Sequence, residues 1–145
     1  MKKVTLYTDG ACSGNPGKGG WGAVLIYKDY QKKFSGFEPE TTNNQMELTA
    51  VIEGLKKLKE PCEVEIYTDS AYVCNAFVEN WIENWKLNGF KNASKKSISN
   101  IELWKELLSL CEIHKATFFK VKGHADNELN NLCDKLATDE IKKHS

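Results

Sequence analysis

The stretches Lys-Val-Thr-Leu-Tyr-Thr-Asp at residues 3–9 and Glu-Val-Glu-Ile-Tyr-Thr-Asp at residues 63–69 decide the fold of this chain. Each alternates apolar and polar side chains, which predicts a strand. Each also ends on the same triplet, so that Asp9 and Asp69 stand at the ends of their strands. If the two strands are parallel neighbours, both carboxylates leave the sheet at its C-terminal edge, where ligands bind in open α/β sheets.

Two more strands are predicted beside the first one. The glycine-dense segment from Gly10 to Gly20 reads as a loop, with a turn at Asn15-Pro16-Gly17. Residues 21–28 and about 31–37 follow as strands, joined by a hairpin connection at Lys28-Asp29-Tyr30. Three early strands with short links predict an antiparallel meander.

From Thr42 onward the apolar residues recur at the spacing of an amphipathic helix, and Pro61 marks the end of that pattern. Thr42 or Asn43 is the expected N-cap. The apolar stripe consists of Leu48, Val51, Ile52, Leu55 and Leu58. Glu47 precedes the stripe by one residue, about 100° around the helix, and is therefore expected at the rim of the buried face.

Four further elements are predicted in the second half of the chain. A short helix spans about residues 70–80, and another helix opens at a capping box formed by Ser99 and Glu102. Residues 116–122 form a last strand, and residues 127–142 form a last helix. The inward stripe of that last helix consists of Leu129, Leu132, Cys133 and Leu136.

The element order β-β-β-α-β-α-α-β-α predicts an α/β fold, with helices on both faces of a five-stranded mixed sheet made of the meander and two parallel strands. The length of 145 residues fits one domain, residues 1–145. No apolar run approaches the roughly 20 residues that span a bilayer. No signal-peptide core precedes Asp9. A cytoplasmic location without a membrane partner is the expectation.

The charges balance, because 20 basic residues offset 20 acidic ones, and every basic residue is a lysine. A neutral total argues against a protein that coats nucleic acid by bulk charge, but it leaves local patches open. One such patch is residues 81–98, where Trp81, Trp85 and Phe90 alternate with four lysines against a single Glu83, a net charge of about +3. Phosphate binding and a solvated loop with buried tryptophans are both open readings of this patch.

Cysteine and histidine supply no metal or nucleophile motif. The five cysteines are odd in number and none forms a C-x-x-C pair, so that neither a disulfide framework nor a zinc site is predicted. Most are expected to be small hydrophobic residues in or near the core. His114 and His144 are expected at the surface.

Four carboxylates are the candidates for chemistry. Asp9 and Asp69 end strands, Glu47 lies at a helix rim, and Asp134 lies off the stripe of the last helix. Carboxylates that converge raise one another's pKa and repel unless a cation binds between them. Oxygen ligands without Cys or His favour Mg²⁺ or Mn²⁺. The alternative is that each is an ordinary turn or surface residue, and periodicity alone leaves that open.

A series of short motifs resembles bacterial type 1 ribonuclease H. They occur in the order of that family and extend from about residue 2 to residue 140. They are Tyr7-Thr8-Asp9-Gly10, the loop from Cys12 to Gly17, Thr42-Asn43-Asn44-x-Met46-Glu47-Leu48, Thr68-Asp69-Ser70-x-Tyr72-Val73, Val121-Lys122-Gly123-His124 and Cys133-Asp134-x-Leu136-Ala137. Together they are a specific signature, whereas each alone is weak.

The resemblance implies a single ribonuclease H-like domain that hydrolyses the RNA strand of an RNA/DNA hybrid and leaves 3′-hydroxyl and 5′-phosphate ends. In the family scheme, Asp9 bridges two Mg²⁺ ions, for which Mn²⁺ is a possible substitute. Asp134 helps to hold the ion that activates water. Glu47 and Asp69 hold the ion that stabilises the leaving oxygen. His124 corresponds to a histidine that assists proton transfer or product release.

The resemblance also implies the substrate contacts. Residues expected near the minor groove of the hybrid are Cys12, Asn15, Asn43, Asn44 and Gln45, and those of a basic protrusion at about 81–98 that grips DNA phosphates are Lys86, Lys95 and Lys96. Asp126 and Asn131 depart from the family pattern, which often has glycine and glutamate there, and this puts the role of His124 in doubt. A monomer that removes RNA primers and hybrids is expected, and protein partners are left open.

Three other functions stay open beside this one. A catalytically silent hybrid-binding module fits the motifs less well, because an inactive relative is free to lose an acidic residue. An enzyme of the same fold that acts on DNA is disfavoured by the asparagine-rich motifs. A plain structural domain leaves the ordered series of motifs unexplained.

Overall fold

A computed structural model describes residues 1–78, 81–87, 89, 100–121 and 127–144 of the chain. Its elements are β1 (Lys2–Gly14), β2 (Gly17–Tyr27), β3 (Tyr30–Thr41), α1 (Asn43–Lys56), β4 (Cys62–Thr68), α2 (Ala71–Val78), α3 (Trp81–Leu87), α4 (Ile101–Ile113), β5 (Lys115–Lys120) and α5 (Glu128–Lys143). The strands form one sheet in the order β3-β2-β1-β4-β5. Strands β1, β2 and β3 pair antiparallel, whereas β4 pairs parallel with both β1 and β5. The predicted α/β class and five-stranded mixed sheet are confirmed.

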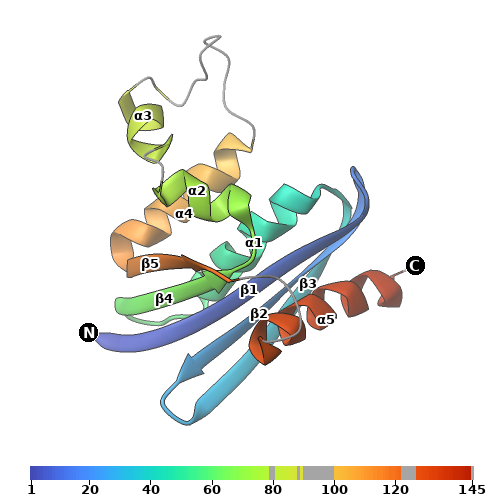
Figure 1. The fold of residues 1–145 in the computed structure, drawn as a ribbon, viewed down its shortest axis with the longest axis horizontal. Helices are drawn as coiled ribbons and strands as arrows, with labels where there is room; N and C mark the ends of the chain where they lie inside the picture. Colours follow the sequence, from blue (N-terminus) through green and yellow to red (C-terminus); the bar gives the residue numbers. More distant parts are fainter. Residues whose placement is uncertain (79–80, 88, 90–99, 122–126, 145) are drawn as a thin grey trace.

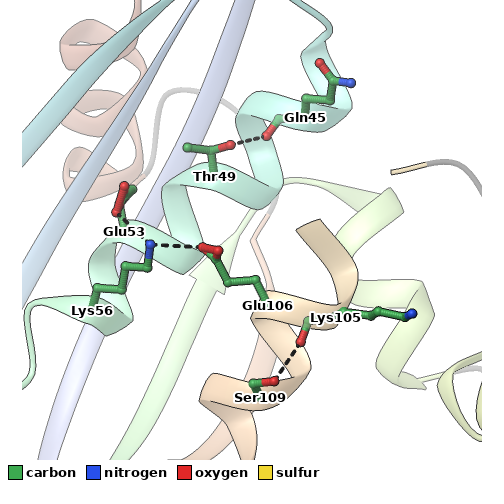
Figure 2. Close-up of polar contacts among 7 residues, drawn as sticks. All are labelled: Gln45, Thr49, Glu53, Lys56, Lys105, Glu106 and Ser109. Atoms are coloured by element: carbon green, nitrogen blue, oxygen red, sulfur yellow. Dashed lines mark hydrogen bonds and ion pairs between the residues drawn. The ribbon is translucent and has the colours of Figure 1, made fainter. Parts of the chain in front are cut away.

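Helices cover both faces of the sheet, as predicted (Figure 1). Helix α5 packs against β1, β2 and β3 on one face, and α1 packs against β1 and β2 on the other. The core lies mainly under α1, where Leu6, Leu48 and Ile66 are fully buried. Helix α4 lies beside α1, and Lys56 of α1 pairs with Glu106 of α4 at 3.0 Å (Figure 2). Both side chains are nearly half exposed, so that this ion pair contributes little to stability.

The expected glycine-rich loop is largely a hairpin, and this prediction is wrong. Strand β1 continues to Gly14 and β2 begins at Gly17, which leaves only Asn15 and Pro16 between them. The glycines serve packing rather than a loop. A Cβ atom on Gly20 would meet the carbonyl oxygen of Ala137 in α5, so that the bare backbone lets this helix lie directly on β2.

The pairing of β1 with β4 places two predicted acidic residues at one edge. Tyr7 lies opposite Tyr67, and Thr8 lies opposite Thr68. Because the strands are parallel, the next residue of each, Asp9 and Asp69, stands at the same C-terminal edge. The two matching triplets therefore bring both aspartates to one edge of the sheet, as the sequence predicts.

Helix α3 forms inside the stretch that was predicted only as a basic aromatic patch. Trp81 and Trp85 are partly buried against the core, and Trp104 of α4 is fully buried, so that these tryptophans are largely structural. The N-cap of α4 is Asn100, which has a left-handed backbone (φ 62°) and makes no side-chain cap. The predicted cap at Ser99 lies outside the described residues.

The prediction that His114 lies at the surface is wrong. The residue follows the last turn of α4 and is only 4% exposed. Its Nδ1 accepts a hydrogen bond from the backbone N–H of Cys62, 3.1 Å away, so that the imidazole joins the start of β4 to the end of α4. Burial lowers the pKa of His114, which favours the neutral ring needed for this contact. His144 is exposed, as predicted.

Cysteine behaves as predicted from its spacing. Within the described residues all five thiols are free, and Cys62, Cys74 and Cys133 are buried. The described helices include none that is both long and apolar enough to cross a membrane.

Candidate active site

Three carboxylates meet where β1, β4 and α1 converge. One oxygen from each of Asp9, Glu47 and Asp69 lies within 4.8 Å of the other two. Asp9 is 5% exposed and Glu47 is 4% exposed, whereas Asp69 is partly exposed. Buried like charges at this separation repel strongly, so that the arrangement is one that a cation stabilises.

The start of α1 positions Glu47. Thr42 is the N-cap, as predicted, and it forms a capping box with Gln45. This fixes the first turn, from which Glu47 points to the end of β1. The prediction that Glu47 sits at a helix rim is corrected, because its side chain is buried in the contact between α1 and β1.

Glu47 is held there from both neighbouring strands. The backbone N–H of Gly10 donates to Glu47 Oε1 and to Asp9 Oδ1, each at 2.9 Å. Thr68 Oγ1 donates to Glu47 Oε2 across a longer 3.4 Å. Both oxygens of this carboxylate therefore have partners on the protein.

The surroundings favour the protonated state of the two buried acidic groups when no cation is present. Burial, reinforced by the neighbouring carboxylates, raises the pKa of Asp9 far above its usual range. Burial also raises the pKa of Glu47, although its hydrogen bonds oppose this shift. A bound cation would reverse the balance, since it favours ionised ligands.

Asp134 joins the same cleft from a different helix. It is exposed on α5 and lines a cleft of about 410 Å³ together with the other three acidic residues. It does not belong to the tight group of Asp9, Glu47 and Asp69. All four predicted carboxylates therefore line one cleft, and three of them form the tight group.

The predicted asparagine residues lie at the entrance of α1. Asn43 and Asn44 line the cleft. Asn15, in the turn between β1 and β2, accepts a hydrogen bond through Oδ1 from the backbone N–H of Asn43 at 3.1 Å. Cys12 is close by but does not line the cleft, and its thiol donates to Thr41 O at 3.3 Å.

Gln45 is engaged within the protein rather than turned to the cleft. Its Oε1 accepts from Thr41 Oγ1 at 2.9 Å and from the backbone N–H of Thr42 at 3.2 Å. Its Nε2 donates to Asn100 Oδ1 at 3.1 Å, which ties the start of α1 to the start of α4. The predicted contact of Gln45 with a substrate has to compete with these bonds.

Three residues of the motif from Thr68 to Val73 line the cleft, although they were not among the predicted site residues. Ser70, Ala71 and Tyr72 form its wall at the start of α2. Tyr72 is fixed because its hydroxyl accepts from Trp104 Nε1 at 2.9 Å and from Asn100 Nδ2 at 3.1 Å. The signal available in the sequence was that these residues directly follow Asp69, the last residue of the repeated triplet.

The remaining predicted residues fall elsewhere. Lys86 is exposed on α3 and lines a separate groove between α2, α3 and α4. Lys95, Lys96 and His124 lie outside the described residues, so that their predicted roles stay predictions.

The donor set fits a hard divalent cation. Asp9, Glu47 and Asp69 offer only carboxylate oxygens, and the described residues add no histidine or cysteine to their group. Oxygen-only ligands suit Mg²⁺ or Mn²⁺, whereas zinc sites are built from thiolates and imidazoles.

Comparison with known proteins gives one consistent answer. A family model described as RNase H matches residues 1–142. Ribonuclease H of Acetivibrio thermocellus is 65% identical over 145 residues, which cover 100% of this chain and 99% of that relative. Ribonuclease H of Chlorobium luteolum is 59% identical over 143 residues, which cover 99% of this chain and 98% of that protein.

Solved structures agree with the sequence relatives. LC9-RNase H1, described as a type 1 RNase H with the type 2 active-site motif, superposes with a TM-score of 0.88 at 28% identity, covering 100% of this chain and 74% of that one. A foamy viral protease-reverse transcriptase in complex with RNA/DNA hybrid superposes with a TM-score of 0.81 at 27% identity, covering 98% of this chain and 20% of that one.

Proposed function

The chain belongs to the RNase H family, a family of nucleases, and from this membership we propose that it is an endoribonuclease that cleaves the RNA strand of RNA/DNA hybrids, leaving 3′-hydroxyl and 5′-phosphate ends. The observation that carries the proposal is the convergence of Asp9, Glu47 and Asp69 at one sheet edge, with Asp134 in the same cleft. The relatives named Ribonuclease H and the hybrid-bound viral structure support the choice of substrate.

The acidic residues of the cleft would hold two Mg²⁺ ions, with Mn²⁺ as a substitute. Bound ions of this kind supply an activated water and stabilise the charge that develops on the phosphate and the leaving oxygen. Asp9 and Glu47 have to lose their protons to serve as ligands, and the Gly10 N–H supports the ionised state of both. Asp134 is the exposed member of the four and would help to hold the ion that activates water.

The polar wall of the cleft would orient the hybrid. Asn43 and Asn44 offer side-chain amides at the start of α1, which suit the 2′-hydroxyl groups that distinguish RNA from DNA. Asn15 would contribute by holding the backbone of Asn43. Lys86, with Lys95 and Lys96, would contact the phosphates of the DNA strand, and His124 would assist proton transfer or product release.

We also propose that one chain is sufficient for activity. All four acidic residues come from the same chain, and so the site needs no residue of a second copy. We propose further that the chain is a single domain over residues 1–145, acts as a monomer, and removes RNA primers and hybrids.

The test uses one labelled RNA strand presented as single-stranded RNA, paired with RNA, and paired with DNA. Each form is incubated with Mg²⁺, with and without EDTA, alongside Asp9→Asn. We expect cleavage of the DNA-paired strand alone, and loss of cleavage by about 1,000-fold or more with EDTA or in the variant, because several kcal/mol of transition-state stabilisation disappear. Tight hybrid binding without any cleavage would favour a silent binding module instead.

A further inference from the structure

Three aromatic rings from three neighbouring strands form a continuous stack. The ring centroids of Tyr7 in β1 and Tyr67 in β4 are 4.9 Å apart with an interplanar angle of 15°. Those of Tyr67 and Phe119 in β5 are 5.1 Å apart at 19°. The strand register produces the stack, because Tyr7 lies opposite Tyr67 and Tyr67 lies opposite Phe119.

Two of the three rings, Tyr67 and Phe119, lie on strands that α5 does not cover. Side chains alternate along a strand, and so Tyr7 and Asp9 share the face on which α5 packs. That helix packs against β1, β2 and β3, and the β5 side chains of this face, Lys115, Thr117 and Phe119, are exposed. On this face, the rings therefore provide side-chain packing across β1, β4 and β5 where the helix does not.

The stack is also the layer directly beneath the two aspartates. Tyr7 and Tyr67 each precede an aspartate by two residues, with only Thr8 and Thr68 between. The end of β4 is held close to the aspartates by a backbone hydrogen bond, in which Val121 N–H donates to Thr68 O at 2.9 Å. The hydroxyl of Tyr67 donates to Glu65 Oε2 at 3.0 Å, which fixes the ring in its own strand.

The carboxylates above the stack repel each other when they are ionised, and this repulsion acts to separate the ends of β1 and β4. We propose that the stack of Tyr7, Tyr67 and Phe119 is a positioning device, which holds these strand ends at a fixed separation and thereby sets the affinity of the carboxylate cluster for divalent ions. The inference rests on the proposed function. It assigns a role to residues that do not line the cleft.

The experiment compares Tyr67→Leu and Tyr67→Phe with the intact wild-type chain. The first readout is Mn²⁺ affinity without nucleic acid, measured by titration calorimetry. The second is kcat and KM on an RNA/DNA hybrid. We expect Tyr67→Leu to weaken Mn²⁺ binding about tenfold, because the interaction energy of an aromatic pair corresponds to a change of about that size. The variant should also lower kcat at limiting Mn²⁺ and leave KM for the hybrid unchanged. Tyr67→Phe keeps the ring and should stay within about twofold of wild type.

Phe118→Leu is the matched control. Phe118 stacks on Phe77 at 4.0 Å on the opposite face of the same strand, away from the aspartates. Its loss should destabilise the fold and leave Mn²⁺ affinity within about twofold of wild type. If Tyr67→Leu does not fold, Phe119→Leu decides, because that ring is 40% exposed and its loss costs little packing. We expect this variant to weaken Mn²⁺ binding about threefold.

Two results would overturn the inference. One is Mn²⁺ affinity in the folded leucine variants equal to that of wild type. The other is an equal loss of affinity in Phe118→Leu, which would make the effect one of general stability. Both are distinct from a failure of the proposed function, in which the wild-type chain itself binds no divalent ion and cleaves no hybrid.

Discussion

Glu47 Oε1 accepts a hydrogen bond from the backbone N–H of Gly10 at 2.9 Å, although 37 residues separate them in the sequence. The bond forms because β1 and the start of α1 touch backbone to backbone. A Cβ atom on Gly10 would stand 2.6 Å from the backbone nitrogen of Glu47. The absence of a side chain at this residue is what allows the two carboxylates of β1 and α1 to share one donor.

Replacing Gly10 with alanine should separate β1 from α1. We expect Gly10→Ala to lower the free energy of unfolding by about 1–3 kcal/mol and to weaken Mn²⁺ binding more than about tenfold. Urea unfolding and calorimetry measure the two effects. Gly54→Ala is the control, because its Cβ would press on the end of the Leu6 side chain, away from the carboxylates. Equal Mn²⁺ affinity in both variants would contradict the prediction.

The stability of the metal-free protein should fall as the pH rises. In the folded chain the pKa values of Asp9 and Glu47 are raised above their usual values of 3.8 and 4.5. Above about pH 4, the folded chain therefore keeps protons that the unfolded chain has released, and the free energy of unfolding falls with pH until the folded groups ionise. We expect this decline in EDTA, measured by urea unfolding between pH 5 and pH 8.

Two additions test the cause of that decline. Asp9→Asn should flatten it and make the metal-free protein more stable at pH 8 by about 2 kcal/mol, because the folded chain no longer has to keep a proton on this buried carboxyl. Saturating Mg²⁺ should raise the free energy of unfolding of the wild-type protein at pH 8, because the ion binds the folded state. Identical pH slopes in wild type and Asp9→Asn would show that another group is responsible.

Tyr72 should matter for stability through its hydroxyl, which accepts hydrogen bonds from Trp104 Nε1 and Asn100 Nδ2. Trp104 is fully buried, and its Nε1 donates to the Tyr72 hydroxyl at 2.9 Å. Tyr72→Phe leaves this donor without an acceptor, and so we expect a loss of about 1–3 kcal/mol in the free energy of unfolding, followed by tryptophan fluorescence in urea. Tyr30→Phe, at a site that is 71% exposed, should change it by less than about 0.5 kcal/mol. Similar values for the two variants would refute the assignment.

Lys86 should contribute to the salt dependence of hybrid binding. We expect Lys86→Ala, in an Asp9→Asn background that leaves the RNA uncut, to reduce the slope of log Kd against log salt concentration by about one unit. Lys32→Ala removes another exposed lysine, in β3, and serves as the control. A slope that changes as much in the control as in Lys86→Ala would place the phosphate contacts elsewhere.

The sequence predicted the strand ends that build the site better than the segments around them. Asp9 and Asp69 were placed correctly, because a period of two residues and a repeated triplet are local signals. The segment from Gly10 to Gly20 was misread, because glycine signals a loop locally while its use here is to admit α5 and α1 against the sheet. Such close approach is a property of the packed structure and leaves no local pattern.

Periodicity also failed to predict that the side chains of Glu47 and His114 are buried. Glu47 was expected at a rim and is buried, since the neighbouring strand rather than its own helix covers it. His114 is buried for a similar reason, beside the start of β4. The resemblance to a family pointed to all four carboxylates at once, whereas the residues alone left their convergence open.

The helix that carries Asp134 also carries a thiol whose labelling rate reports on the movement of that helix. Cys133 is fully buried on α5, where its carbonyl oxygen lies against Gly22 of β2, and burial raises the pKa of its thiol. A thiol reagent can therefore reach this sulfur only while α5 is lifted from the sheet or the chain is unfolded. The labelling rate under native conditions therefore measures how often α5 leaves the sheet. Whenever α5 is away from the sheet, the cleft lacks Asp134, its fourth carboxylate.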